Sequence, residues 1–375
     1  MESSFHKHFR WIPDPRVGNN KRHKLLDVVI LSVIAVICGA DSWYDIEEFG
    51  HSKKEYLQQL LTLENGIPSH DTFNRVFMVI DHKLFERAFR AWAAELSSQI
   101  KDGMAQPLVR EHIGIDGKCL RGSADSYHEL GALYLVSAWS DRNKLVLGQQ
   151  KVSEKSNEIT AIPELLSLLD IKSAIITIDA MGTQTKIARQ IIDKEADYIL
   201  SLKENHPTLY EQTESLFNTY KEDSYSQDID KGHGRIEIRT CKVINKLQWL
   251  DEKENWPGMK SIIKIESVRD INGKSSQQNR YYISSLRVDA AFFNESIRKH
   301  WGIENNLHWQ LDVSFGEDYN RTRSGQAAEN LALVRKMALN ILKAETSSKR
   351  SIKGKRLKAA WDNDYLLKLL TIHDF

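Results

Sequence analysis

The sequence has few cysteines, with three among 375 residues. Cys38, Cys119 and Cys241 are widely separated, and none belongs to a CxxC pair. This spacing argues against a disulfide framework and against a cysteine-rich zinc site. Unpaired cysteines are typical of a reducing compartment, so we expect a cytoplasmic protein.

A hydrophobic run long enough to cross a membrane is also lacking. The apolar segment from Val28 to Ala40 spans 13 residues between Asp27 and Asp41, whereas a membrane helix needs about 20 residues. The small-residue cleavage pattern of a signal peptide does not follow it. The segment therefore predicts a buried helix, and we expect no membrane association.

Net charge is nearly absent as well, at +1, but the cations are unevenly distributed. Residues 1–24 contain six Lys or Arg against two acids, and residues 343–358 contain seven against Glu345 alone. Basic ends on a neutral chain suit contact with a polyanion, although solvated tails have the same composition. The remaining composition, 41% hydrophobic and 27% charged, indicates a globular protein long enough for two or three domains.

The first hundred residues have the pattern of short helices. The runs SKKEYLQQLL and SHDTFNRVFMVI are separated by a turn at 65–68 and precede a longer amphipathic segment at 82–100. Short helices around a tight turn fit a helix-turn-helix module, and they fit a plain bundle equally well. We therefore predict an all-helical N-terminal domain, residues 1–105, that makes DNA or assembly contacts.

From about residue 108 the pattern changes to short, β-branched runs. Strand and helix candidates follow in the order β-β-β-α-β-α-β: IGID, ALYLVSAWS, KLVLGQQKV, NEITAIPELLSLLD, SAIITID, 184–194 and DYILSL. A three-strand meander followed by parallel crossover units is the order of a ribonuclease-H-like core. We predict an α/β catalytic domain over 106–345 with a β-rich insertion near 206–288, and a basic C-terminal tail at 346–375.

Two aspartates lie where predicted strands end, and a glutamate lies far downstream in an aromatic-rich helix. Asp116 closes EHIGIDGK, Asp179 closes SAIITIDAMGTQ, and Glu304 lies in IRKHWGIENNLHWQLD. In the predicted sheet the first and fourth strands are neighbours, which brings the two aspartates together. A carboxylate at a buried strand end is costly unless it is neutralised. Mg²⁺ or Mn²⁺ is the usual neutraliser, so the pattern favours two-metal phosphodiester chemistry.

The glutamate helix also allows a different metal site. His300, Glu304 and His308 lie four residues apart, so a helical zinc site of imidazoles and a carboxylate is chemically possible. Their spacing is not the HExxH of metalloproteases, however, and this interpretation leaves both aspartates unexplained.

Several long motifs carry a family resemblance. In chain order they are GIPSHDTFNRVF, DGKCLRGS, TIDAMGTQ, LSLKENHP, GHGRIEIR and HWGIENNLHWQLDVSFGED. With these motifs the sequence resembles the DDE transposases of bacterial insertion sequences, and among them the H-repeat-associated subgroup. The resemblance covers nearly the whole chain.

The resemblance implies a function, a cofactor and partners. It implies a DNA transposase that cuts the ends of an insertion-sequence-like element and joins the freed 3′-hydroxyls to target DNA. Asp116, Asp179 and Glu304 would be the catalytic, metal-binding triad for two Mg²⁺ or Mn²⁺ ions. Double-stranded DNA would be the partner, bound by a homodimer. The alternatives are a non-catalytic DNA-binding relic and a structure-selective nuclease on the same fold.

Basic and polar residues near the triad are candidates for phosphate contacts. Lys118 and Arg121 follow the first aspartate, and Lys203 follows the fifth strand at the sheet edge where ligands gather. An ordinary salt bridge is the alternative for Lys118, and a structural hydrogen bond is the alternative for His308. The full set of candidate DNA-binding residues is Lys118, Arg121, Lys203, Asn205, Arg298, His300, Asn305 and His308.

The chain departs from the family pattern beside the glutamate. Related transposases carry Tyr, Arg and Lys at −7, −4 and +7 from the glutamate, where this chain has Ile297, His300 and Leu311. In the family these residues contact the transposon end and assist excision through a DNA hairpin. Their absence leaves the excision route open.

Overall fold

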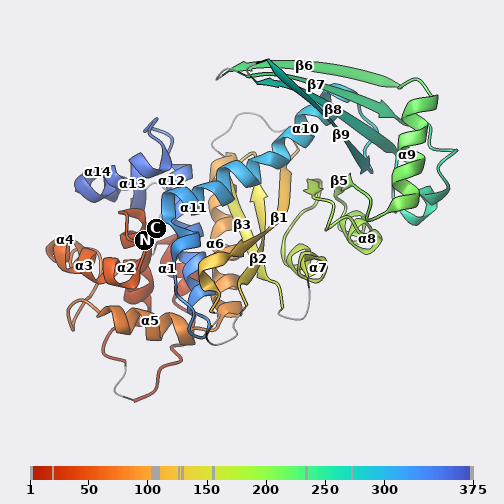
Figure 1. The fold of residues 1–375 in the computed structure, drawn as a ribbon. Coiled ribbons are helices and arrows are strands. Elements are labelled where there is room, and N and C mark those ends of the chain that lie inside the picture. Colours follow the sequence, from red (N-terminus) through yellow and green to blue (C-terminus); the bar gives the residue numbers. More distant parts are fainter. Residues whose placement is uncertain are drawn as a thin grey trace.

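The computed structural model describes residues 3–18, 21–102, 110–125, 127, 131–153, 157–232, 235–271 and 273–371. A helical body lies at one end, a sheet in the middle and a long β-ribbon at the other end (Figure 1). The predicted domain boundary at 105/106 lies outside the described residues, as do His233 and Gly234 of the GHGRIEIR motif.

In its described part the N-terminal region consists of helices. The apolar segment forms α2, which is buried from Asp27 to Ile37 because other helices surround it, so the predicted buried helix is confirmed. Within the described residues, no helix combines the length and the apolar character that a bilayer span requires. The helices of this region are α1 (Ser4–Phe9), α2 (Leu25–Ile37), α3 (Trp43–Ser52), α4 (Lys54–Leu57), α5 (His70–Val79) and α6 (His82–Asp102).

The central sheet begins with an antiparallel meander of β1 (His112–Leu120), β2 (Leu133–Ser140) and β3 (Leu145–Lys151). β4 (Ile175–Ile178) pairs parallel to β1, and β5 (Asp197–Leu202) pairs parallel to β4. The crossovers contain α7 (Glu158–Leu168) and α8 (Thr185–Asp193). The resulting order, β3-β2-β1-β4-β5, is ribonuclease-H-like, so the predicted element order and the adjacency of the first and fourth strands are confirmed.

The sheet continues into an antiparallel ribbon. It contains β6 (Ser224–Gly232), β7 (Arg235–Ile244), β8 (Ser261–Ile271) and β9 (Lys274–Ser284), preceded by α9 (Pro207–Thr219), and β9 pairs with β5. β7, β8 and β9 match apolar runs of the sequence. β6 was not predicted, because SYSQDIDKG is polar and its outer part is exposed.

A nearly continuous helical segment follows the ribbon. It comprises α10 (Ala290–Ile303), the π-helical turn η4 (Glu304–His308) and α11 (Trp309–Phe315). Figure 1 shows it running from the ribbon along the sheet to the helical body. Phe293 and Ile297 pack on the apolar inner part of the ribbon, and Ile303 lies over Gly114 of β1. Helix α10 is therefore held by the ribbon and by β1 before the chain reaches Glu304.

Helix α12 (Ala327–Ala344) joins the helical body to the sheet. It packs against α2, α5 and α6 on one side and β3 on the other. The Asn340 amide donates to the Val146 carbonyl at 2.9 Å and accepts from the Val146 N–H at 2.8 Å. A helix late in the chain thus lies in the core of the N-terminal helices.

The predicted basic tail is folded over most of its length. Its described part forms α13 (Ile352–Trp361) and α14 (Asn363–Thr371), which pack into the core of the helical body. Arg356 is 4% exposed and donates to the carbonyls of Val36 (3.0 Å), Ala40 (3.2 Å) and Ser314. Two of the seven Lys and Arg residues in the C-terminal segment 346–375, Lys355 and Arg356, are buried. They tolerate burial because they donate to carbonyl groups at helix ends.

Replacing Arg356 with Ala should destabilise the protein by roughly 3 kcal/mol or more, because buried carbonyls each cost about 1–3 kcal/mol when they lose a donor. Urea unfolding measures this cost. Lys353→Ala, on the exposed side of the same helix, is the control and should change stability by less than about 0.5 kcal/mol. Equal stability of the two variants would mean that α13 is only loosely attached.

Candidate active site

Asp116 and Asp179 meet at the carboxyl edge of the parallel strands. Asp116 lies within β1, whose parallel register with β4 ends at the pair Ile115–Ile178. Asp179 directly follows β4 in the chain, so the next residue of each strand is an aspartate. This edge is where ligands gather in sheets with parallel crossovers.

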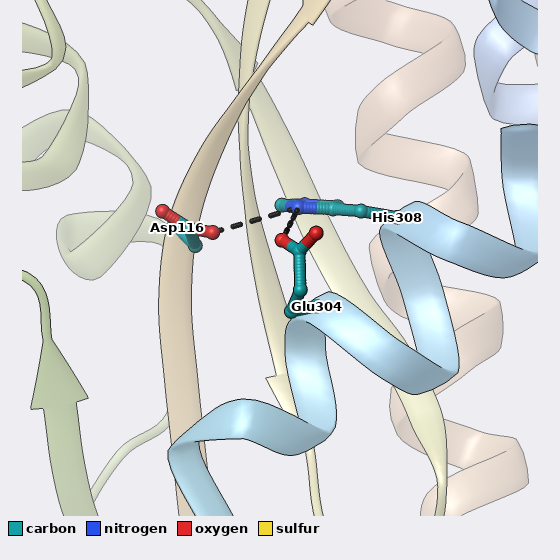
Figure 2. Close-up of side chains that lie close together, drawn as sticks. All are labelled: Asp116, Glu304 and His308. Carbon is teal, nitrogen blue, oxygen red and sulfur yellow. Dashed lines mark ion pairs between the residues drawn. The ribbon is translucent and has the colours of Figure 1, made fainter. Parts of the chain in front are cut away.

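Glu304 and His308 approach the same place from the π-helical turn. The His308 Nδ1 atom lies 3.5 Å from Asp116 Oδ2 and 3.4 Å from Glu304 Oε2 (Figure 2). One ligand atom from each of the three residues lies within 4.8 Å of the others. Single π-turns are frequent at functional sites, and here the wide turn points the glutamate and the histidine toward β1.

The carboxylates of the site repel one another. Burial, together with the charges of Asp179 and Glu304, raises the pKa of Asp116 to about 6, although His308 opposes this rise. The hydrogen bond with His308 lowers the pKa of Glu304, which is more exposed than Asp116. A bound cation would relieve this repulsion.

A fourth carboxylate, Glu158, was not singled out in the sequence. It occupies the first turn of α7, where Asn157 caps the helix by accepting from the Ile159 N–H at 3.1 Å. Burial and the charges of Asp179 and Asp116 raise the pKa of Glu158 to about 7. In the sequence, Glu158 resembles an ordinary first-turn acid. The sequence held no signal for it, because Glu158 approaches Gly117, beside Asp116, only in the folded chain, where a Cβ at Gly117 would overlap the Glu158 carboxylate.

The residues present fit a divalent cation. Carboxylate oxygens are the ligands that Mg²⁺ and Mn²⁺ prefer. The His308 side chain is 5% exposed, and its Nε2 atom has no hydrogen-bond partner among the described residues. His300 and Asp179 both lie outside the metal-spaced group of Asp116, Glu304 and His308. The His300 Nδ1 atom lies 2.9 Å from the Thr177 hydroxyl oxygen instead, so the helical site of two histidines and a glutamate is not formed.

The loop after Asp179 is held by its own hydrogen bonds and by the LSLKENHP motif. The Gly182 N–H donates to Asp179 Oδ1 at 3.2 Å, and the Thr183 hydroxyl donates to the Asp179 carbonyl at 3.0 Å. The Asn205 amide donates to the Ala180 carbonyl at 2.8 Å. Asn205, a candidate DNA contact, thus fixes the loop that carries Asp179, whereas Lys203 is exposed at the same edge.

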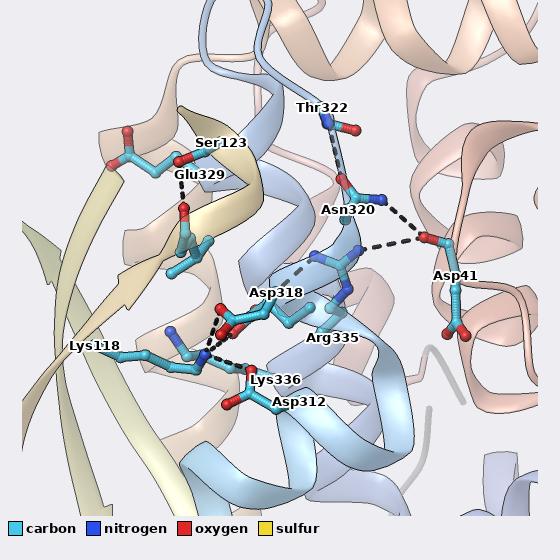
Figure 3. Close-up of polar contacts among 12 residues, drawn as sticks. Asp41, Lys118, Ser123, Asp312, Asp318, Asn320, Thr322, Glu329, Arg335 and Lys336 are labelled. Atoms are coloured by element: carbon cyan, nitrogen blue, oxygen red, sulfur yellow. Dashed lines mark hydrogen bonds and ion pairs between the residues drawn. The ribbon is translucent and has the colours of Figure 1, made fainter. Parts of the chain in front are cut away.

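Lys118 is buried among carboxylates. Its ammonium lies 2.5 Å from Asp312 and 3.2 Å from Asp318 (Figure 3), and it lies 3.6 Å from Glu317. Burial lowers the pKa of Lys118, but Glu317, Asp312 and Asp318 together raise it above its usual value. The side chain therefore ties β1 to α11, and its charge is already balanced.

Other candidate DNA contacts differ in their availability. Arg121, with 83% of its side chain exposed, lies 3.8 Å from an Asp318 oxygen, and Asn305 is also exposed. Arg298 donates to Asp230 of the ribbon at 2.8 Å, with about half of each side chain exposed. Arg121 and Asn305 are therefore the more accessible of these side chains.

His300 is held by β4. Its Nδ1 atom lies 2.9 Å from the Thr177 hydroxyl oxygen, and burial lowers its pKa to about 4. The ring is neutral near pH 7 and links α10 to the strand that precedes Asp179. His300 thus helps to set the distance between the glutamate helix and the aspartates.

Comparison with known proteins identifies similar chains. The family model described as Transposase DDE domain matches residues 108–341, and the model described as DDE_Tnp_1-associated matches residues 6–93. The putative transposase YncI of Escherichia coli O157:H7 is 45% identical over 96% of this chain and 92% of its own length. The H repeat-associated putative transposase YhhI of E. coli K12 is 41% identical over 97% of both chains. A piggyBac transposase in complex with hairpin DNA aligns with 98% of this chain and 77% of its own, at 12% identity and a TM-score of 0.39.

Replacing His300 with Gln should reduce the amount by which the free energy of unfolding falls between pH 6.5 and pH 4. The unfolded chain binds a proton at His300 below about pH 6.5, whereas the folded protein does so only near pH 4. Stability therefore falls as the pH drops through this window. Urea unfolding at several pH values measures the slope.

In His300→Gln, the free energy of unfolding should still depend on pH through His112, because burial lowers the pKa of His112 to about 4 as well. His51→Gln, at a side chain that is 58% exposed, is the surface control. An unchanged slope in His300→Gln would contradict the neutral, buried state of His300.

Proposed function

From the premise that this chain belongs to the DDE transposase family, we propose that it is an active DNA transposase. It cuts the ends of an insertion-sequence-like element and joins the freed 3′-hydroxyls to target DNA. The observation that carries the proposal is the convergence of Asp116, Glu304 and His308 within 4.8 Å, with Asp179 on the adjacent strand end.

Each residue of the site has a distinct task in this proposal. Asp116, Asp179 and Glu304 hold two divalent ions, Mg²⁺ or Mn²⁺, through their carboxylate oxygens. Bound ions of this kind supply activation of the attacking oxygen and stabilisation of the leaving 3′ oxygen. His308 lies against Asp116 and Glu304 and orients both carboxylates.

The same three carboxylates support both cutting and joining. Water is the attacking group when the element end is nicked, and the freed 3′-hydroxyl is the attacking group when the strand is joined to target DNA. The site must therefore hold the same phosphodiester geometry for two different nucleophiles. Lys118 joins β1 to α11, and His300 joins α10 to β4. These contacts favour such a fixed geometry.

DNA is the proposed partner, bound through exposed side chains around the site. Arg121, Lys203 and Asn305 are exposed near the carboxyl edge of the sheet and can reach phosphate oxygens. We expect two copies of the chain to act together, because coordinated cutting requires paired element ends. We expect the reaction in the cytoplasm, in line with the free thiols of Cys38, Cys119 and Cys241.

Incubation with labelled DNA that carries the element ends, with Mg²⁺ or Mn²⁺, tests the function. Wild type should nick the ends and join strands, and Glu304→Ala should do neither, because a carboxylate ligand is lost. Glu295→Ala, a 68% exposed glutamate on the same helix, is the control and should retain activity. Asp116→Asn should abolish cleavage while DNA affinity is kept or increased, because repulsion from phosphate falls.

Other outcomes of this experiment point to other functions. Cutting without joining would indicate a structure-selective nuclease. Binding without cutting under both metals would indicate a non-catalytic relic. Equal cleavage by Asp116→Asn and wild type would contradict the assignment of the metal site.

Arg121→Ala and Lys203→Ala should each weaken DNA binding and reduce the slope of log K against log salt by about 1, because each phosphate contact releases about one counterion. Fluorescence anisotropy at several salt concentrations measures the slope. Lys172→Ala, exposed at the opposite, amino end of β4, is the matched control. A slope equal to that of wild type would remove the residue from the DNA interface.

A further inference from the structure

Glu158 lies against the backbone of the strand that carries Asp116. The residue next to Asp116 is Gly117, and the Glu158 carboxylate occupies the space that a Cβ at this position would fill. The Asn157 cap fixes the start of α7, and Glu158 is the first helical residue after it. The absent side chain at Gly117 and the capped helix together bring a fourth acid to the site.

Asp116 has acidic neighbours on two sides. On one side it lies with Glu304 and His308, each within 4.8 Å. On the other side Asp116 and Asp179 are the carboxylates whose charges act on Glu158. A carboxylate with acidic neighbours on two sides is the arrangement expected when two neighbouring cations are bound.

No described side chain balances the charge of Glu158. Hydrogen bonds and ion pairs to its carboxylate are absent among the described residues, and only the more distant His308 attracts it. The buried Lys118 beyond Gly117 is already paired with Asp312 and Asp318. A half-buried carboxylate beside two others is costly without a counterion.

Glu158 can be reached by an ion from solvent. It lines a cavity of about 840 Å³ together with Tyr134, Lys151, Met181 and Arg323. An ordinary first-turn glutamate points into open solvent and interacts with the helix dipole alone. Glu158 instead lies between this cavity and the strand of Asp116.

We propose that Glu158 is a fourth carboxylate of the metal site, which together with Asp116 and Asp179 holds the second divalent ion. This inference rests on the proposed function, because it assigns a ligand to a site that the function requires. It extends the acidic triad by a residue from α7, an element that carries none of the three.

Mn²⁺ binding, measured by calorimetry and by electron paramagnetic resonance of free Mn²⁺, tests the proposal without DNA. Glu158→Gln should weaken the second binding event by at least roughly 10- to 100-fold, because removal of a group that only supports metal ligands already has an effect of this size. Glu164→Gln is the matched control, since Glu164 lies on the same helix, is exposed and accepts from Gln150. It should bind Mn²⁺ as wild type does.

Gly117→Ala is an independent variant that keeps every charge. Its methyl group displaces the Glu158 carboxylate, so it should weaken the same binding event as Glu158→Gln does. If Glu158→Gln fails to fold, Mn²⁺ binding by Gly117→Ala alone tests the proposal.

In thermal unfolding, Glu158→Gln should melt at or above the temperature of metal-free wild type, because repulsion among the carboxylates is relieved. It should also gain less from added Mn²⁺ than wild type gains.

Asp116→Asn separates failure of this proposal from failure of the proposed function. If Asp116→Asn loses Mn²⁺ while Glu158→Gln and Gly117→Ala bind it as wild type does, Glu158 is not a ligand and the proposed function stands. If wild type itself binds no Mn²⁺, both proposals are overturned.

Discussion

Repulsion among carboxylates at one sheet edge is the constraint on which the rest of the structure depends. The fold brings Asp116, Asp179, Glu304 and Glu158 together, and burial among like charges raises the pKa of Asp116 to about 6 and that of Glu158 to about 7. Such a cluster persists only on a scaffold that is stable without it. The parallel pairing of β1 with β4 and the apolar core beneath both strands provide that scaffold.

Residues from distant parts of the chain fix the glutamate against this scaffold. His300 hydrogen bonds to Thr177 one turn before the glutamate, and Lys118 ties β1 to Asp312 two turns after it. Neither residue is free to act on DNA in the way its position in the sequence indicates. Both instead act through Glu304, which makes them positioning residues in the proposed reaction.

The helical body is part of the same scaffold. α12 lies among the N-terminal helices and hydrogen bonds to β3 through Asn340, while Arg356 joins α13 to the end of α2. Near its end, the segment that carries the glutamate joins these contacts through the Ser314 carbonyl, which accepts from Arg356. The orientation of the N-terminal helices relative to the carboxyl edge of the sheet is therefore set by buried polar contacts.

The sequence by itself determined the order of the core strands and helices, the buried α2 and the placement of Asp116 and Asp179 at neighbouring strand ends, because apolar periodicity is a local signal. It did not determine β6, whose polar residues form a strand only because β7 offers a partner along its whole length. It also did not determine the partners of Lys118, almost 200 residues away in the chain, nor the approach of Glu158 to Asp116. Those contacts depend on register and helix placement, which arise only when distant segments pack, and tertiary structure alone decided them.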